Sequence, residues 1–177
     1  DNILNGTTGH TTAKITAQHD VIYDELLSHI GEEKTLLYYK ANEQALQFMK
    51  NLIQTENIDC DFSVQDAYLY GETLEFDHRV RKEFRAYQRL HIPCEFATEL
   101  PFNFDIRAAA IMKDQAQFHP LKYLLHLAKK FTESGGLIFE NTVATDVEES
   151  TSPTVVTRGG HRISCKYVVA CSHFPFY

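Results

Sequence analysis

The sequence lacks long apolar runs and basic clusters. None of its 177 residues belongs to a stretch that approaches the roughly 20 apolar residues of a transmembrane helix, and no basic segment leads into an apolar run at its start. Basic residues form no stripe, and the formal net charge is −7, so nucleic acid and anionic membranes are poor partners. We therefore predict a cytoplasmic protein without a nucleic-acid or membrane partner.

Metal-binding patterns and disulfide spacing are also missing. The nine histidines include no H-x-x-x-H or H-E-x-x-H arrangement, so the sequence predicts no zinc site. The four cysteines lie far apart except for Cys165 and Cys171, and each has apolar or β-type neighbours. This spacing is typical of reduced, buried thiols in a cytoplasmic protein.

What is present is a succession of helix and strand patterns that predicts an α+β fold. A Gly- and Thr-rich loop at residues 6–14 leads into a helix that a threonine caps. Apolar spacing carries this helix over residues 15–30, and Gly31 is expected to end it. A second helix is predicted over residues 32–56, and the two helices together would form a helical hairpin. The apolar face of the second helix is predicted to consist of Leu37, Ala41, Ala45, Phe48 and Leu52.

Residues 61–118 predict a sheet with one helix. Aromatic and polar residues alternate over residues 62–70, as in a half-buried strand. A helix over residues 77–90 follows, then a short strand at 95–97 and a longer one across 106–117. These elements suggest a mixed, largely antiparallel sheet.

The last third predicts a helix followed by further strands. Pro120 starts the helix at its first turn and Gly135-Gly136 closes it. Strands are expected at residues 137–140, 143–149 and 154–158, and the adjacent glycines Gly159-Gly160 predict a hairpin turn after them.

The closing apolar segment, residues 167–171, resembles a strand buried in the middle of a parallel sheet. The sheet that this strand would join is not in the sequence, and the chain opens on Asp1 rather than Met. We expect the chain to be a central part of a larger protein.

The helix after Pro120, the Gly-Gly pair, the strand at Val143, the hairpin and the ending Ala-Cys-Ser-His-Phe-Pro form a familiar order. This order resembles the central region of FAD-dependent oxidoreductases of the glycine oxidase and D-amino-acid oxidase family. The opening GTTGHTTAKITAQH looks like bacterial members whose flavin module precedes a Rieske [2Fe-2S] domain. The resemblance implies FAD in the full-length protein, and an iron–sulfur cluster only in a downstream domain.

The resemblance also implies three consecutive segments within one compact fragment. Residues 1–60 would form the FAD-side loop and a helical hairpin, and residues 61–118 the substrate-side sheet that closes over the isoalloxazine. Residues 119–177 would return the chain to the FAD-binding domain.

The resemblance places site residues in four parts of the chain. The loop that wraps the pyrophosphate and flavin side of FAD would contain Gly6, Thr7, Thr8, Gly9, Thr11 and Thr12. Backbone groups of Val143 would meet the adenine ring. The strand end that passes the nucleotide would comprise Ala170, Cys171 and Ser172. The polar residues expected nearest the substrate-side face are Gln115, Gln117 and His119.

Several family features are missing from the sequence. No G-x-G-x-x-G motif follows a strand, although that motif supplies the principal pyrophosphate contact of a dinucleotide site. Cys171-Ser172-His173 matches one half of a Rieske ligand pattern, but no C-x-x-H pair completes it, so a strand end is expected there. The chain by itself is therefore expected to bind neither FAD nor iron tightly.

Structural roles compete with the functional ones. The threonine loop suits a solvated helix entry, and His119 suits the cap of the helix at Pro120. The tyrosines Tyr68 and Tyr70 would cover either a flavin or a core.

The leading hypothesis is the oxidation of an amine or amino-acid-like substrate by hydride transfer to FAD, with electrons passing to a Rieske cluster elsewhere. The partners would then be a small-molecule substrate and the rest of the polypeptide. The alternative is a non-catalytic α+β module that binds a small ligand or a protein.

Overall fold

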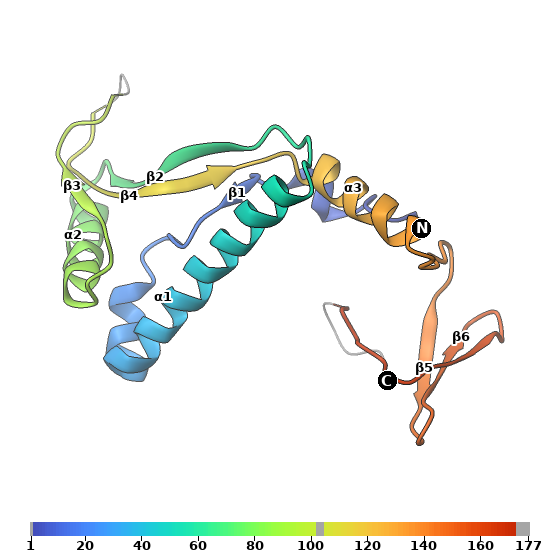
Figure 1. Ribbon diagram of the computed structural model, residues 1–177. Coiled ribbons are helices and arrows are strands. Elements are labelled where there is room, and N and C mark those ends of the chain that lie inside the picture. Colours follow the sequence, from blue (N-terminus) through green and yellow to red (C-terminus); the bar gives the residue numbers. More distant parts are fainter. Residues whose placement is uncertain (1, 102–104, 173–177) are drawn as a thin grey trace. The chain divides into compact units, whose positions relative to one another are not determined.

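The computed structural model describes residues 2–101 and 105–172 (Figure 1). They form two compact units, one from Thr8–Leu127 and the other from the described parts of Asp1–Thr7 and Ala128–Tyr177. Each unit has its own antiparallel sheet, which confirms the predicted α+β class. The unit boundaries differ from the three predicted segments, whose assignment to a FAD side and a substrate side stays a prediction.

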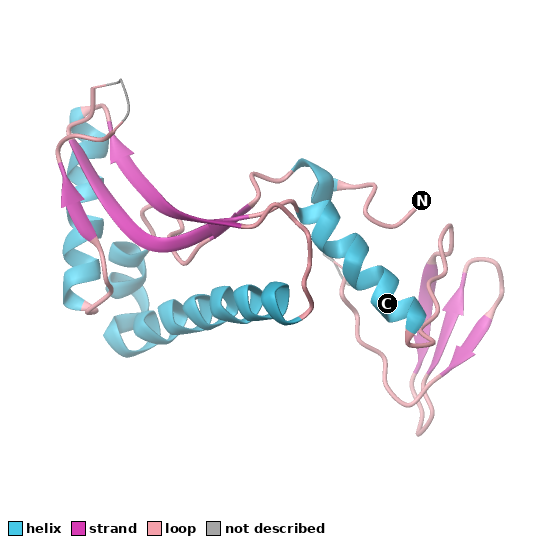
Figure 2. Cartoon of the chain, turned by 45° about the horizontal axis from the view of Figure 1, so that its top comes forward, coloured by secondary structure: helices cyan, strands magenta, loops and turns pink. Residues whose placement is uncertain are grey.

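The sheet of the larger unit is built around β4 (Ala108–Gln117). Antiparallel partners of β4 are β1 (Lys14–Ile15), β2 (Ser63–Gly71) and β3 (Glu95–Ala97). The long strands β2 and β4 run side by side (Figure 2). The strands predicted at 62–70, 95–97 and 106–117 are thereby confirmed.

Two helices, α1 (Tyr23–Thr55) and α2 (Leu74–Arg89), pack with this sheet. The Thr73 hydroxyl caps α2 by accepting the N–H of Phe76 at 3.2 Å. Gly31 interrupts α1 with φ 80° and ψ 172°, so the predicted break at this glycine is confirmed. Because α2 presents small and apolar residues to the fully buried alanines of β4, helix and sheet approach closely.

The start of the first helix was predicted wrongly. Residues 14 and 15 form β1, and α1 begins only at Tyr23. Its first N–H groups bond to a side chain from α2, because the buried carboxylate of Glu83 accepts the amides of Tyr23 and Asp24, each at 2.9 Å. Long-range partners therefore replace the local helix and threonine cap that apolar spacing predicted.

The apolar face predicted for residues 32–56 is also the wrong one. Leu37 and Phe48 are 59% and 65% exposed, whereas Leu46 and Ile53 are buried. Apolar residues occupy more than one face of α1, and the neighbouring elements of the larger unit cover the face that carries Leu46. Spacing alone does not tell which of two apolar faces is covered.

Helix α3 (Pro120–Glu133) begins in the larger unit at the predicted proline. The smaller unit holds the antiparallel sheet of β5 (Ala144–Glu148), β6 (Thr154–Thr157) and β7 (Arg162–Ser164). The predicted hairpin at Gly159-Gly160 is confirmed, and Gly160 takes φ 80° in that turn.

Two strands predicted in the last third are absent from the described structure. Residues 137–140 and 167–171 have no strand conformation, and Tyr167 and Val169 are 85% and 80% exposed. Both segments are apolar enough for a sheet, but neither finds a strand partner among the described residues. The prediction of a strand at residues 137–140 is therefore wrong, whereas burial of residues 167–171 in a sheet of a larger protein stays a prediction.

Candidate functional site

The threonine-rich loop is exposed and largely free to bind a ligand. Residues Thr7–His10 form a short 3₁₀ helix, and all six predicted loop residues are at least partly exposed. Within the described chain, only the Thr11 hydroxyl among their side chains has a protein partner, the N–H of Ala13 at 3.2 Å. Hydroxyl and N–H donors left open in this way suit a diphosphate, so the loop fits the pyrophosphate of FAD.

Pairing of β1 with β4 brings this loop to two of the predicted substrate-side residues. Lys14 lies opposite Gln117, and the N–H of Phe118 donates to Ala13 O at 3.1 Å. Next to the loop, a Cβ at Gly9 would lie 3.4 Å from Leu121 at the start of α3. A pocket of about 330 Å³ opens here, lined by Ala13, Asp61, Gln117, Phe118, His119 and Pro120.

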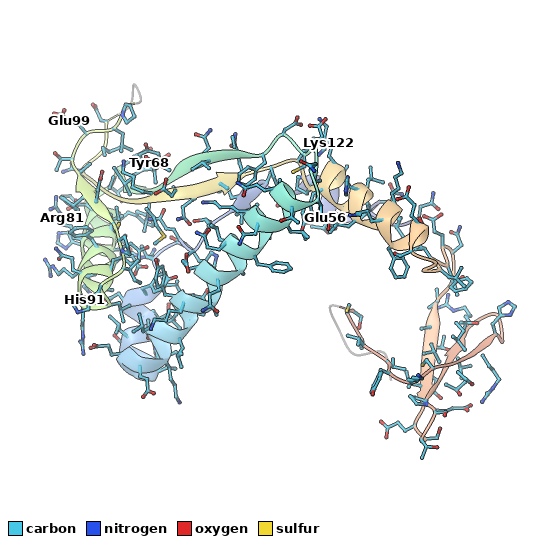
Figure 3. The ribbon with its side chains drawn as sticks, viewed as in Figure 1. Glu56, Tyr68, Arg81, His91, Glu99 and Lys122 are labelled. Carbon is cyan, nitrogen blue, oxygen red and sulfur yellow. The ribbon has the colours of Figure 1, made fainter. Side chains whose placement is uncertain are left out.

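One rim of this pocket carries an ion pair. Lys122, labelled at the start of α3 in Figure 3, places Nζ 2.8 Å from Asp61 Oδ2. The hydrogen bond from Lys122 holds the pKa of Asp61 below its usual range. Burial raises the pKa of the neighbouring Cys60 thiol, so this thiol stays protonated near neutral pH and is a poor nucleophile. Beside Gln117 and His119 the rim therefore carries an ionised Asp61 whose charge Lys122 compensates.

His119 also has a structural role. Its N–H donates to Cys60 O at 2.6 Å, and its Nδ1 lies 3.5 Å from the N–H of Lys122 in the first turn of α3. This geometry supports the capping role that the sequence left open. The imidazole remains exposed on the pocket, so the substrate-side role stays a prediction.

Gln115 lies close to the loop exit, but its side chain is buried and engaged. Its Oε1 accepts the N–H of Ala17 at 2.8 Å and the hydroxyl of Thr16 at 3.0 Å, and its Nε2 donates to Lys113 O at 2.7 Å. Of the three predicted substrate-side residues, only Gln117 and His119 line the pocket.

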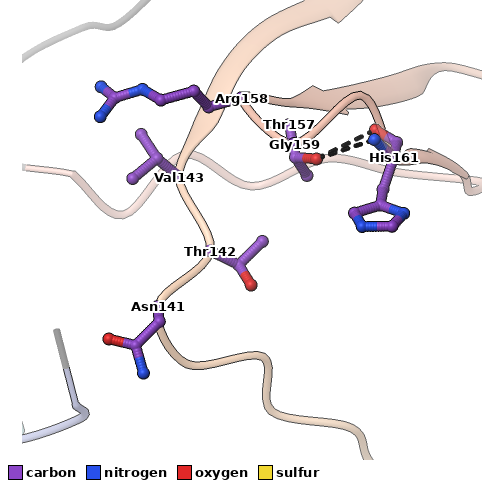
Figure 4. A pocket seen from close by; sticks show the side chains of 7 residues that line it. All are labelled: Asn141, Thr142, Val143, Thr157, Arg158, Gly159 and His161. Carbon is purple, nitrogen blue, oxygen red and sulfur yellow. Dashed lines mark hydrogen bonds between the residues drawn. The ribbon is translucent and has the colours of Figure 1, made fainter.

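Val143 lies in the smaller unit, immediately before β5. It lines a pocket of about 390 Å³ with Arg158 and His161 of the hairpin (Figure 4). The carbonyl of Val143 accepts the N–H of Arg158 at 2.9 Å. The N–H of Val143 has no partner within the described chain. An unpaired N–H at a pocket edge fits a ring nitrogen of adenine as acceptor, so this position suits the predicted adenine contact.

The predicted nucleotide-side turn, Ala170 to Ser172, is exposed and outside any strand. Cys171 is an exposed free thiol, whereas Cys60 is buried and both Cys94 and Cys165 are intermediate, so the prediction of uniformly buried thiols is wrong at Cys171. His173 lies outside the described residues. A role for this turn in cofactor binding stays a prediction.

Sequence reasoning missed two polar contributors to these pockets. Asp61 gave no motif signal, because only the fold brings its turn beside Pro120. Arg158 gave no usable signal either, because a register shift between Ala144 and Asp146 intervenes. Regular counting outward from the loop between β5 and β6 would place residue 158 opposite Ala144, whereas the structure pairs Ala144 with Thr157.

The described residues contain neither a membrane-spanning helix nor a cluster of metal-ligating side chains. Over residues 2–101 and 105–172, no helix is both long and apolar enough to cross a bilayer. In the same ranges, no group of three His, Cys, Asp or Glu side chains could hold a metal ion.

The chain is similar in sequence to a family of oxidoreductases and to two curated proteins. The family model described as FAD dependent oxidoreductase matches residues 1–174. The putative Rieske 2Fe-2S iron-sulfur protein YhfW of Bacillus subtilis (strain 168) is 44% identical over the whole chain, which corresponds to 35% of that protein. The probable oxidoreductase OrdL of Haemophilus influenzae is 24% identical over 133 residues, 71% of this chain and 31% of that protein. The chain thus spans about a third of the length of these curated relatives.

Solved structures show the same fold. Glycine oxidase from Geobacillus kaustophilus superposes with a TM-score of 0.74 at 15% identity, over 95% of this chain and 45% of that one. L-amino acid deaminase from Proteus vulgaris gives a TM-score of 0.66 at 15% identity, over 93% of this chain and 38% of its own. With the family model covering nearly every residue, the chain belongs to the family of FAD-dependent oxidoreductases.

Proposed function

We propose that the full-length protein oxidises an amine or amino-acid-like substrate by hydride transfer to FAD, and that this chain supplies part of the cofactor site and the substrate-side surface. One observation carries the proposal: the exit of the threonine loop and the residues Gln117 and His119 line a common pocket. Solved structures of similar fold are named glycine oxidase, L-amino acid deaminase and L-proline dehydrogenase, which supports an amino-acid-like substrate.

FAD, when bound, supplies the hydride acceptor of the reaction. The hydroxyls of the partly exposed Thr8 and the exposed Thr12, together with the N–H groups around Gly9, would donate hydrogen bonds to its diphosphate. The unpaired N–H of Val143 would bind the adenine edge. The remaining residues placed on the cofactor side are Gly6, Thr7, Thr11, Ala170, Cys171 and Ser172.

Residues of the pocket would bind and orient the substrate. Gln117 offers an amide donor and acceptor, and His119 offers an exposed ring nitrogen. Asp61 and Lys122 would present an ion pair at the rim of the pocket, in which the lysine compensates the charge of the carboxylate. No side chain of the chain is assigned as a catalytic base. Hydride transfer would start from the neutral amine, which becomes the iminium ion as the hydride leaves, so an ammonium substrate would first lose its proton to solvent.

We further propose that the full-length protein contains a Rieske domain outside this chain. The relative that is 44% identical over this chain is named a Rieske 2Fe-2S iron-sulfur protein, and this chain covers 35% of it. An iron and sulfide analysis of the purified full-length protein tests the proposal, which expects two irons for each polypeptide. Iron-free, folded protein from iron-replete cells would contradict it.

An absorption spectrum of the full-length protein tests the flavin proposal. The expected result is a yellow protein that releases FAD on denaturation.

The variants Thr8→Val and Thr12→Val remove hydroxyl donors and should each weaken FAD binding roughly tenfold, the usual effect of a lost hydrogen bond to a charged group. Thr98→Val, at an exposed position outside the loop, is the matched control. A folded, colourless full-length protein would sink the proposal and favour the non-catalytic binding module.

A further inference from the structure

The segment that follows the threonine loop is held by side chains rather than by helix formation. After the loop, Ala13 has φ 61°, a conformation that a residue other than glycine keeps only when its surroundings impose it. Residues 14 and 15 pair with β4, but that pairing is only two residues long. Other contacts must therefore fix the loop exit.

Gln115 provides the main contact of this kind. It follows a bulge in β4, where Lys113 and Asp114 together lie opposite the single residue Asp66, and Asp114 takes φ 56°. A bulge of this type redirects the side chains that follow it. The carboxamide oxygen of Gln115 accepts both the N–H of Ala17 and the hydroxyl of Thr16, at 2.8 and 3.0 Å.

A second glutamine extends the same network. Thr16 Oγ1 accepts the N–H of Gln18 at 2.9 Å, and Gln18 Nε2 donates to Ala110 O at 3.1 Å. Gln115 Nε2 is fixed in turn by Lys113 O. The bonds to Gln115 and to Ala110 O join the loop exit to β4, and the bonds of Gln18 to Thr16 and of Gln115 to Lys113 hold these groups in place. The side chains of Gln18 and Gln115 are buried, and an unpaired polar group in such a place is costly.

We propose that Gln115 is a positioning residue for the cofactor loop, one that orders residues 8–12 through residues 13–17 and does not itself touch substrate. This inference rests on the proposed FAD site, and it replaces the substrate-side role expected for Gln115. Loss of its acceptor leaves the N–H of Ala17 and the Thr16 hydroxyl without their partner. The loop exit then depends on the two residue pairs of β1, the bond from Phe118 to Ala13 O, and the bonds of Gln18 to Ala110 O and of the Tyr23 hydroxyl to Ala17 O.

Hydrogen–deuterium exchange of the full-length protein without FAD, combined with FAD titration, tests the proposal. Gln115→Met removes the acceptor at similar volume, and Gln115→Glu keeps it. Gln65→Met is the matched control, because Gln65 lies directly opposite Gln115 on β2 and is exposed, and among the described residues its side chain bonds only to the Ser63 hydroxyl. We expect Gln115→Met to speed exchange of residues 8–18 and to weaken FAD binding roughly tenfold, Gln115→Glu to restore slow exchange in part, and the control to change neither.

Other outcomes overturn the proposal. Unchanged exchange and affinity in Gln115→Met would show that the network does not order the loop. A weaker affinity with unchanged exchange of residues 8–18 would mean direct contact with the cofactor or substrate. Thr16→Val, which removes the bond to Gln115 and the one from the N–H of Gln18 but keeps the bond between Ala17 and Gln115, replaces Gln115→Met if exchange of α2 shows that Gln115→Met unfolds the larger unit. If the wild type binds no FAD, the proposed function fails, and the exchange comparison still decides whether Gln115 orders the loop.

Discussion

The two units contain similar strand-forming sequence but differ in what covers it. In the larger unit, β4 lies between β2, β3 and β1 and packs on α2, so its alanines and Met112 are buried. In the smaller unit, β5, β6 and β7 bury only Val147 and Thr157 among their residues. Apolar segments such as 167–171 remain exposed there. Strand propensity therefore produces a stable core only where other elements supply a second layer.

The largest expected effect concerns the helix start of the larger unit. Glu83 is fully buried and is the only side chain that bonds to the first N–H groups of α1 within the described chain. Glu83→Ala leaves two buried amides unpaired, which should cost about 3 kcal/mol of unfolding free energy. Glu83→Gln keeps one acceptor and should cost less. Urea unfolding followed by hydrogen exchange at β4 measures both, and an equal, small effect of the two variants would contradict the capping role.

The same carboxylate predicts a pH dependence confined to the larger unit. Burial raises the pKa of Glu83 above its ordinary value of 4.5, so the folded state favours the protonated form. Its stabilising contribution is full below pH 4.5 and declines as pH rises through the raised pKa of the folded state. Relative to Glu83→Gln, the wild type should lose stability over that range, as amide exchange at β4 would show. A difference that stays constant with pH would contradict this assignment.

The two faces of α1 offer a second contrast. Leu46 is buried while Phe48 is 65% exposed. In the 177-residue chain, Leu46→Ala should therefore cost about 2–4 kcal/mol, and Phe48→Ala less than about 0.5 kcal/mol. Chemical denaturation of both variants measures the difference. A large cost of Phe48→Ala would show that the exposed face is covered in solution.

The sequence predicted the helices and strands of the larger unit better than the contacts between them. Strands β2, β3 and β4 and the start of α3 at Pro120 followed from local signals, namely alternation and a proline at a first helical turn. The beginning of α1 did not, because its first N–H groups bond to Glu83, far away in sequence. The segment before α1 is held in the same way by Gln115, which bonds to Ala17. The choice between the faces of Leu46 and Phe48 likewise depends on what packs against the helix. For the candidate site, the family resemblance proposed Gln117 and His119, which line the pocket, while the position of Asp61 beside them required the fold.

One matched substitution compares the units directly. Val80 in α2 and Val147 in β5 are 0% and 8% exposed, but Val80 belongs to the large central cluster. Val80→Ala should cost about 2–3 kcal/mol and Val147→Ala about 1 kcal/mol, because the smaller sheet can relax around the lost methyl groups. Exchange at β4 and at β6 reports the two units separately, which a single unfolding curve does not. Equal costs would show that the smaller unit is as tightly packed as the larger one.

The smallest expected effect is electrostatic and local to the smaller unit. Arg162 in β7 bonds to both carboxylate oxygens of Glu148 in β5, and this pair holds the pKa of Glu148 below its usual range. The pair therefore stabilises the sheet above the ordinary pKa of the carboxyl group, and the contribution is lost as pH falls through the lowered value. Arg162→Gln should raise exchange in β5 and β6 less than Val147→Ala does, and 1 M salt should remove the difference because both groups are exposed. An effect that survives high salt would instead assign the stabilisation to packing of the Arg162 stem against the sheet.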